Sequence, residues 1–387
     1  MDFGLTDEQL MLRNMGQEFA EHYIIPATLD NDRNEQFPEG IIKEMAPLGL
    51  LESIVPQEYG GSGLDYISYA VVTEEVARAS LSIAMSVFCT HSVVEEMVMT
   101  WGNEEQKQEY LPAMCKGEMF TCCALTESSA GVNVSNINTT AKLSQERWVL
   151  NGNKLFVING GISNLALVFA RANRNSEYQG ISAFLVNRDA AGFSTQNICT
   201  KSGLRAANIA NVYFQDCRIP RENLLGNIDD GPRIIEDLLY SIHFSVAASC
   251  VGVTQACIDA CVKYVEERSA FRMSISNFDM IQEMIADMIV GTEAARLLVY
   301  RVGELRNKGQ PFSKQLFMAR YLASDVAMRA VTNAIQVHGA SGYVKELPVE
   351  RYFRDVTEVI MYGGPPLVHK LAVARLTFGI SPQISLV

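Results

Sequence analysis

The imidazole side chains of this chain are the groups whose ordinary pKa lies closest to neutrality. The five histidines stand at positions 22, 91, 243, 338 and 369. Imidazole can act as a base or an acid near pH 7. A lone histidine can equally be a packed, hydrogen-bonded core residue, so both interpretations stay open for His91 and His243. Tyr240 and Tyr362 could donate a hydrogen bond to a ligand, although aromatic packing is the commoner role of tyrosine.

Two further groups of residues could bind a ligand. The loop Gly339-Ala340-Ser341-Gly342 would let backbone amides approach a phosphate, and its alternative is a plain helix-connecting turn. Cys257 and Cys261 lie four residues apart and would share a helix face. No His or Cys nearby completes a tetrahedral set, so we expect no metal site.

The elements that must position these groups follow an α–β–α order. Thr6 and Gln9 form a capping box that opens a helical region, which we expect to fill residues 1–119. Residues 120–228 alternate short apolar stretches with turns, among them a hairpin predicted at Asn151-Gly152. Residues 229–387 return to helical periodicity and predict a four-helix bundle. The expected fold is therefore a helical domain, a small β-barrel or sandwich, and a helical bundle.

Composition narrows the possible partners and the compartment. The 387 residues carry a net charge of −12, which argues against nucleic acid or an anionic membrane as partner. No uninterrupted apolar run approaches the ~20 residues of a membrane span. The start has neither a basic nor an apolar region, so we expect no secretory signal. Together with nine cysteines, this predicts a cytoplasmic protein with free thiols.

Several motifs, in this order, resemble those of the acyl-CoA dehydrogenase family along nearly the whole chain. They are Glu58-Tyr59-Gly60-Gly61-Ser62-Gly63, Gly102-Asn103-Glu104-Glu105-Gln106-Lys107, Leu125-Thr126-Glu127, Arg218-Ile219-Pro220-Arg221-Glu222-Asn223-Leu224-Leu225-Gly226, Glu267-Arg268-Ser269-Ala270-Phe271, Gln336-Val337-His338-Gly339 and Arg354-Asp355 before Tyr362-Gly363-Gly364-Pro365. No single motif decides the matter, but the ordered set does. The resemblance implies an oxidoreductase that binds FAD and an acyl thioester.

The same resemblance implies which positions serve each ligand. Positions expected to contact FAD are Thr126, Phe156, Ile158, Arg268, Phe271, Gln336, Gly339 and Gly342. Positions expected on the substrate side are Val132, Tyr240, Tyr362 and Gly364. Arg268 is expected to reach the diphosphate across a subunit boundary, and its alternative is a helix-surface ion pair.

The chain departs from the family pattern at positions that would face the ligands. The family's catalytic glutamate, which removes the substrate's α-proton, corresponds to Gly363. Ile158 and Val132 replace hydroxyl-bearing residues, so several polar contacts to the flavin are lost. A family variant that places its base on a preceding helix corresponds to Ile242-His243, which also lacks a carboxylate. His243 takes the position of an arginine beside that carboxylate, and His91 lies on the helix that lines the acyl pocket in relatives.

Three functional hypotheses are compatible with these departures. The first is a flavoprotein that acts on an atypical acyl thioester, carried by CoA or by an acyl carrier protein, with His91 or His243 as relocated base. The second is a catalytically silent subunit of a heteromer with an active relative. The third is a flavin-free enzyme that reuses the acyl pocket. A homotetramer or homodimer is the assembly that the resemblance implies.

Overall fold

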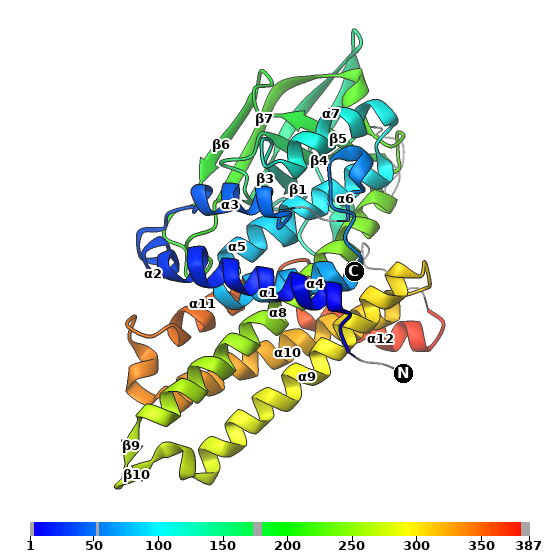
Figure 1. Cartoon of the computed structure of the whole chain (residues 1–387). Coiled ribbons are helices and arrows are strands. Elements are labelled where there is room, and N and C mark those ends of the chain that lie inside the picture. The colour runs from blue at the N-terminus through cyan, green and yellow to red at the C-terminus, as the bar shows by residue number, and fades with distance from the viewer. Residues whose placement is uncertain (1–3, 52–53, 173–179, 381–387) are drawn as a thin grey trace.

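A computed structural model describes residues 4–51, 54–172 and 180–380. The extreme ends of the outer two expected domains, residues 1–3 and 381–387, lie outside this described part. An N-terminal group of helices, a central sheet and a C-terminal bundle follow one another along the chain (Figure 1). The predicted fold class is confirmed.

The N-terminal helices begin where side chains satisfy their free amides. Thr6 Oγ1 accepts a hydrogen bond from the amide of Gln9 at 3.2 Å, and Gln9 Oε1 accepts one from the amide of Thr6 at 3.0 Å. This pair confirms the predicted capping box. Asn103 and Gln106 repeat this arrangement. The helices are α1 (Asp7–Phe19), α2 (Ile25–Asn34), α3 (Glu39–Met45), α4 (Tyr66–Ala79), α5 (Leu81–Ser86), α6 (Ser92–Trp101) and α7 (Glu104–Cys115), with a π-helical turn at Val87–His91 between α5 and α6.

The central domain is one strongly curved sheet. Its strand order is β6-β7-β3-β2-β4-β5-β8, and β1 pairs in parallel with β4. The strands are β1 (Thr121–Ala124), β2 (Thr140–Ser144), β3 (Arg147–Ile158), β4 (Leu165–Arg171), β5 (Ile181–Asn187), β6 (Phe193–Asn197), β7 (Ile209–Pro220) and β8 (Leu224–Leu225). Its own core lies around Trp148 and Phe184, whose rings meet edge to face at 5.1 Å.

The hairpin predicted at Asn151-Gly152 is wrong. These residues lie within the continuous strand β3, where the pairing with β7 shifts register between Leu150 and Gly152. The turn falls earlier, at Gln145 and Glu146, which both adopt the positive φ values that a two-residue hairpin turn requires. Pairing with the long strand β7 therefore overrides the local turn signal.

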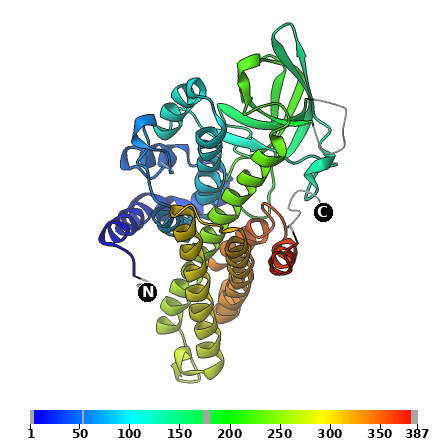
Figure 2. The same ribbon diagram turned by 90° about the vertical axis from the view of Figure 1, so that its right-hand side faces the viewer.

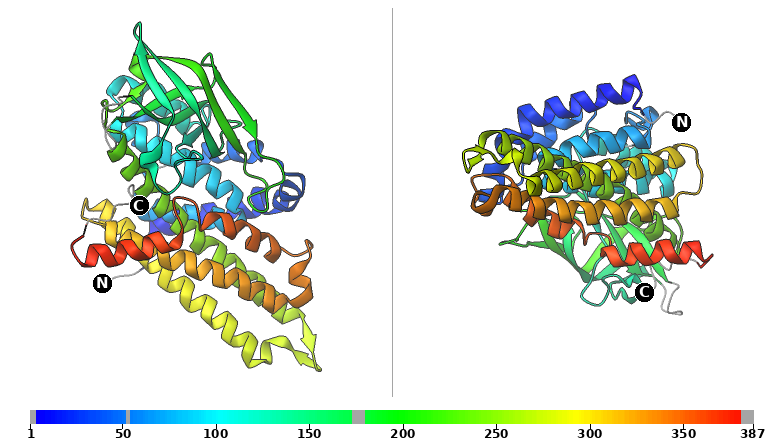
Figure 3. Two further views of the ribbon diagram at one scale, coloured as in Figure 1. Left: turned by 180° about the vertical axis from the view of Figure 1, so that it is seen from behind. Right: turned by 90° about the horizontal axis from the view of Figure 1, so that it is seen from below.

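The C-terminal bundle is built around one long helix. Its members are α8 (Gly231–Glu267), α9 (Asp279–Asn307), α10 (Ser313–His338), α11 (Val349–Val359) and α12 (Pro366–Thr377). The short strands β9 (Ser269–Ala270) and β10 (Met273–Ser274) cap its far end. Seen from below, α8, α9 and α10 run side by side, with α12 beneath the sheet (Figure 3). The side view shows α8 passing from the β-domain into the bundle (Figure 2).

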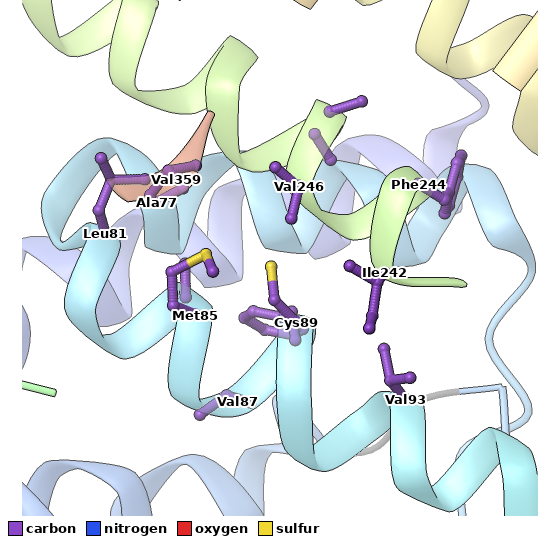
Figure 4. Packing of buried hydrophobic residues seen from close by; sticks show 14 of the residues in the cluster. Ala77, Leu81, Met85, Val87, Cys89, Val93, Ile242, Phe244, Val246 and Val359 are labelled. Carbon is purple, nitrogen blue, oxygen red and sulfur yellow. The ribbon is translucent and has the colours of Figure 1, made fainter. Parts of the chain in front are cut away.

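The main core lies where the N-terminal helices pack against α8. Met85 and Cys89 face Ile242 and Val246 across this contact (Figure 4), and all four are at most 4% exposed. The segments Leu81–Trp101 and Gly231–Glu267 are long and apolar enough to cross a membrane, but 94% and 78% of their most apolar windows are buried inside the protein. Such burial is what the core helices of a globular protein show.

Candidate functional site

The candidate site is built around the turn between α11 and α12, which contains Gly363. Gly363 has a φ of +76°, a conformation that side chains disfavour. A Cβ there would lie 3.1 Å from two ring atoms of His243 and 3.0 Å from Ile242 Cγ2. The position that the family resemblance assigns to the catalytic carboxylate is therefore closed by the imidazole of His243.

His243, on α8, is fully buried without a hydrogen-bond partner. Its exposure is 0%, and neither ring nitrogen has a partner among the described residues. Burial, and then the neighbouring His369 and Arg320, hold the pKa of His243 well below its usual range. A buried polar atom left unpaired costs about 1–3 kcal/mol, and such atoms in folded proteins call for an explanation such as a catalytic role. His243 is thus a neutral imidazole with a free lone pair.

His369, on α12, completes this cluster. Its ring meets that of His243 at a centroid distance of 4.5 Å and an angle of 74°. Its Nε2 lies 3.1 Å from the carbonyl oxygen of Gly364. No sequence motif singles out His369, because its partners His243 and Phe317 lie on other helices.

Arg320, on α10, supports the turn from behind. Its Nη2 donates to the carbonyl oxygens of Val359 and Ile360 at 3.2 Å and of Tyr362 at 3.0 Å. Its Nη1 also bonds to Ser324. A cation at the C-terminus of α11 complements the helix dipole. Sequence motifs did not single out Arg320 either, yet it fixes the backbone beside Gly363.

His91 is engaged elsewhere. Its Nδ1 lies 3.0 Å from Thr121 Oγ1, its Nε2 lies 3.3 Å from the Met114 carbonyl, and its ring stacks on Phe120 at 4.8 Å. Burial lowers the pKa of His91 to about 4. Glu95 Oε1 also lies 3.4 Å from Nε2, and both side chains are fully buried, so both ring nitrogens of His91 already face groups of the protein.

The hydroxyls of the two candidate tyrosines are paired with other side chains. Tyr240 donates from its hydroxyl to Glu236 at 2.7 Å and lines a cavity of about 550 Å³. This cavity also holds the ion pair of Arg306 with Glu96. Burial raises the pKa of Tyr362, whose hydroxyl pairs with Thr90. Both phenols are therefore already hydrogen-bonded.

The candidate flavin residues fall into two groups. On the β-domain, Phe156 presents a ring that is 64% exposed, and Val132 is 42% exposed. Thr126 lies beside them, because its carbonyl accepts from the amide of Leu155 at 2.9 Å. Ile158 differs, since its side chain is buried in the strand. The structure thus presents Phe156, and not Ile158, to a ligand.

The second group gathers at the far end of the bundle. It consists of Arg268, Phe271, Gln336, Gly339 and Gly342, around the end of α8, the β9–β10 hairpin and the end of α10. Phe271 is 89% exposed. Arg268 is exposed, and its guanidinium forms no ion pair within the described ranges. Nothing lies within 4 Å of the place where a Cβ at Gly339 would stand, so there is open space beside this residue, although its own amide donates to the carbonyl of Gln336.

The β9–β10 hairpin beside the second group lies at the end of the bundle that is far from the sheet carrying the first group (Figure 1). The two groups therefore lie in different domains of the chain.

The architecture and this divided site define a three-domain oxidoreductase scaffold. Family models described as acyl-CoA dehydrogenase N-terminal, middle and C-terminal domains match residues 6–118, 122–217 and 229–377. The chain belongs to the acyl-CoA dehydrogenase family.

Individual relatives match over almost their whole length. The chain is 36% identical to the mouse mitochondrial short-chain specific acyl-CoA dehydrogenase, covering 96% of this chain and 90% of the relative. It is 37% identical to acryloyl-CoA reductase (NADH) of Anaerotignum propionicum, covering 97% and 95%. The solved structure of butyryl-CoA dehydrogenase from Megasphaera elsdenii superposes with a TM-score of 0.95 at 31% identity, covering 98% and 100%.

Proposed function

We propose that the protein is a flavin-dependent oxidoreductase of an acyl thioester in which His243 replaces the family's carboxylate as proton acceptor. The observation that carries this proposal is the contact between the Gly363 position and the His243 ring. The imidazole occupies the space next to the missing carboxylate, and both of its nitrogens are unpaired among the described residues. The thioester is either an acyl-CoA or an acyl chain on a carrier protein.

FAD is the cofactor of the family, and the residues present fit it in two halves. Phe156 would pack on one part of it, and Arg268 with the amides near Gly339 would hold its diphosphate. Because these two groups of residues lie in different domains, we propose a homodimer or homotetramer in which each cofactor is held by two copies of the chain. When bound, FAD supplies a hydride acceptor.

The protein's own task is to take a proton from the α-carbon of the thioester. His243 is neutral at pH 7 because burial keeps its pKa well below its usual range. Its lone pair is therefore free, and the same burial lowers its affinity for the proton that it accepts. The electron pair of the broken C–H bond then forms the double bond between the α- and β-carbons as the β-hydrogen leaves as hydride. Because residue 363 is glycine, the space that a side chain would fill is left to the imidazole of His243.

The test is a single-turnover experiment on FAD-loaded protein without oxygen. Short saturated acyl-CoA thioesters, with butyryl-CoA first, are mixed with wild type and with His243→Gln while the flavin absorption is followed. Glutamine cannot accept the proton, so bleaching should slow by about 10²–10⁴-fold, the usual contribution of a general base. FAD content and melting temperature should stay close to those of wild type.

A matched control places the same substitution at an exposed histidine. His22→Gln should bleach at the wild-type rate, since His22 only contacts the Glu18 carbonyl at 2.8 Å. Unchanged bleaching in His243→Gln would refute His243 as the base. Slow bleaching in His91→Gln alone would transfer the role to His91.

A second candidate function is the silent subunit of a heteromer. Its support is the apolar character of Val132 and Ile158, together with glycine at position 363. This candidate predicts a protein that stays colourless after FAD is added and that co-purifies with a relative carrying the glutamate. For either function we propose a cytoplasmic location, supported by free thiols in the described part of the chain such as those of Cys122, Cys250 and Cys257.

A further inference from the structure

His369 has contacts that packing alone does not explain. It is fully buried, its ring stacks on Phe317 at 6.1 Å and 15°, and it meets His243 edge to face. Its Nδ1 has no hydrogen-bond partner among the described residues. A hydrocarbon ring would fill the same space without leaving a buried polar atom unpaired.

The hydrogen bond to Gly364 fixes which nitrogen carries the proton. A carbonyl oxygen can only accept, so Nε2 of His369 must be the donor in the 3.1 Å contact. In the neutral ring Nδ1 is then the acceptor, with a free lone pair. His369 is neutral because burial lowers its pKa to about 3. The turn at Gly363-Gly364 therefore selects the tautomer of His369.

The free acceptor lies beside the free imidazole of His243. The two rings are in direct edge-to-face contact, with centroids 4.5 Å apart. A hydrogen bond between them requires the His243 ring to turn, because Gly364 holds the His369 ring. Besides burial, His369 from α12 and Arg320 from α10 lower the pKa of His243 through the repulsion of positive charge, whereas a neutral His369 presents only a lone pair to it. Arg320 is a cation, so a proton on His243 needs an acceptor nearby to offset the repulsion.

We propose that His369 is a positioning residue for His243. Its Nε2–H anchors the ring to Gly364, and its Nδ1 accepts a hydrogen bond from His243 when His243 takes up a proton. The two imidazoles and the turn then form one unit, in which the backbone of the turn sets the orientation of the base. This inference rests on the proposed function of His243.

Nuclear magnetic resonance of ¹⁵N-histidine-labelled, FAD-loaded protein tests the inference without substrate. The Nε2 of His369 should show a protonated nitrogen and its Nδ1 an unprotonated one. A titration should show His243 gaining its proton in the folded protein. The opposite tautomer of His369, or a His243 that stays neutral down to the pH of unfolding, would overturn the proposal.

Two variants separate positioning from packing. His369→Phe keeps a ring but removes both nitrogens, and it should lower the titration midpoint of His243 by about one pH unit, which is a tenfold change in proton affinity. His369→Gln keeps a donor and an acceptor and should restore most of the midpoint. If the titration midpoint of His243 is unchanged in His369→Phe, or shifts equally in both variants, His369 has only a packing role.

The bleaching rate of His243→Gln separates the proposed role of His243 as base from the proposed positioning role of His369. If that variant bleaches normally, the proposed base is wrong whatever His369 does. If His243→Gln is slow but His369→Phe bleaches at the wild-type rate with the wild-type pH profile, only the positioning role fails. If His369→Phe does not fold, the tautomer and titration of the wild-type protein still decide.

Discussion

A methyl group at position 363 should be costlier than the same group at another glycine of similar backbone conformation. Gly363 has a φ of +76° and Gly309 a φ of +60°. Both variants to alanine lose about 1–2 kcal/mol to the left-handed backbone. A Cβ at Gly309 meets nothing within 4 Å, whereas at Gly363 it lies 3.0–3.1 Å from Ile242 and His243. Overpacking of this kind costs about 1–3 kcal/mol more.

The assay is chemical unfolding of Gly363→Ala, Gly309→Ala, His243→Ala and the double variant Gly363→Ala with His243→Ala. Gly363→Ala should be less stable than Gly309→Ala by about 1–3 kcal/mol. Removing the imidazole should relieve most of that difference, so the double-variant cycle should show coupling above about 0.5 kcal/mol. Equal costs for the two glycines, or no coupling to His243, would refute the idea that His243 closes the position of the carboxylate.

Three further outcomes follow from the same geometry. Gly363→Glu alone should give no butyryl-CoA dehydrogenation in FAD-loaded protein, because the new side chain meets His243. Gly363→Glu combined with His243→Ala should be more active than Gly363→Glu alone. Activity in the single variant would contradict the packing of His243 against position 363. Arg320→Met should destabilise the protein by about 2 kcal/mol or more, since it removes the side-chain donor of the partly buried carbonyls of Ile360 and Tyr362, at about 1–3 kcal/mol each. The exposed control Arg329→Met should stay within about 0.5 kcal/mol, and equal losses of the two variants in denaturant would count against this role. The pKa of His91 falls on folding from about 6.5 to about 4, so the native state binds fewer protons and loses about 3 kcal/mol as pH drops through that window. His91→Gln should flatten this loss in unfolding curves recorded between those pH values, and an equally steep curve would place the titrating group elsewhere.

The arrangement of domains could be predicted because its signals are local and repeated. The capping box at Thr6 needs only residues three apart, and helical periodicity persists along α8 to α10. The hairpin at Asn151-Gly152 failed for the opposite reason. Pairing with β7, a long-range contact, decided the conformation there against a strong local preference.

The site was only partly visible in the sequence. Glycine at position 363 could be read directly, but its contact with His243 joins α8 to the turn after α11. The roles of His369 and Arg320 depend on α10 and α12 meeting α8, and no local motif encodes that meeting. The placement of β3, which carries Phe156, and of the β9–β10 hairpin, which follows Arg268, likewise depends on the whole fold (Figure 1) and not on either motif.

The visible absorption spectrum of the purified protein, before and after FAD is added, shows whether the protein binds the flavin that the proposed activity needs. We expect flavin bands with close to one FAD per chain, retained through gel filtration together with an oligomer. A protein that stays colourless with excess FAD would contradict the proposed flavin-dependent activity and leave the silent subunit as the better explanation.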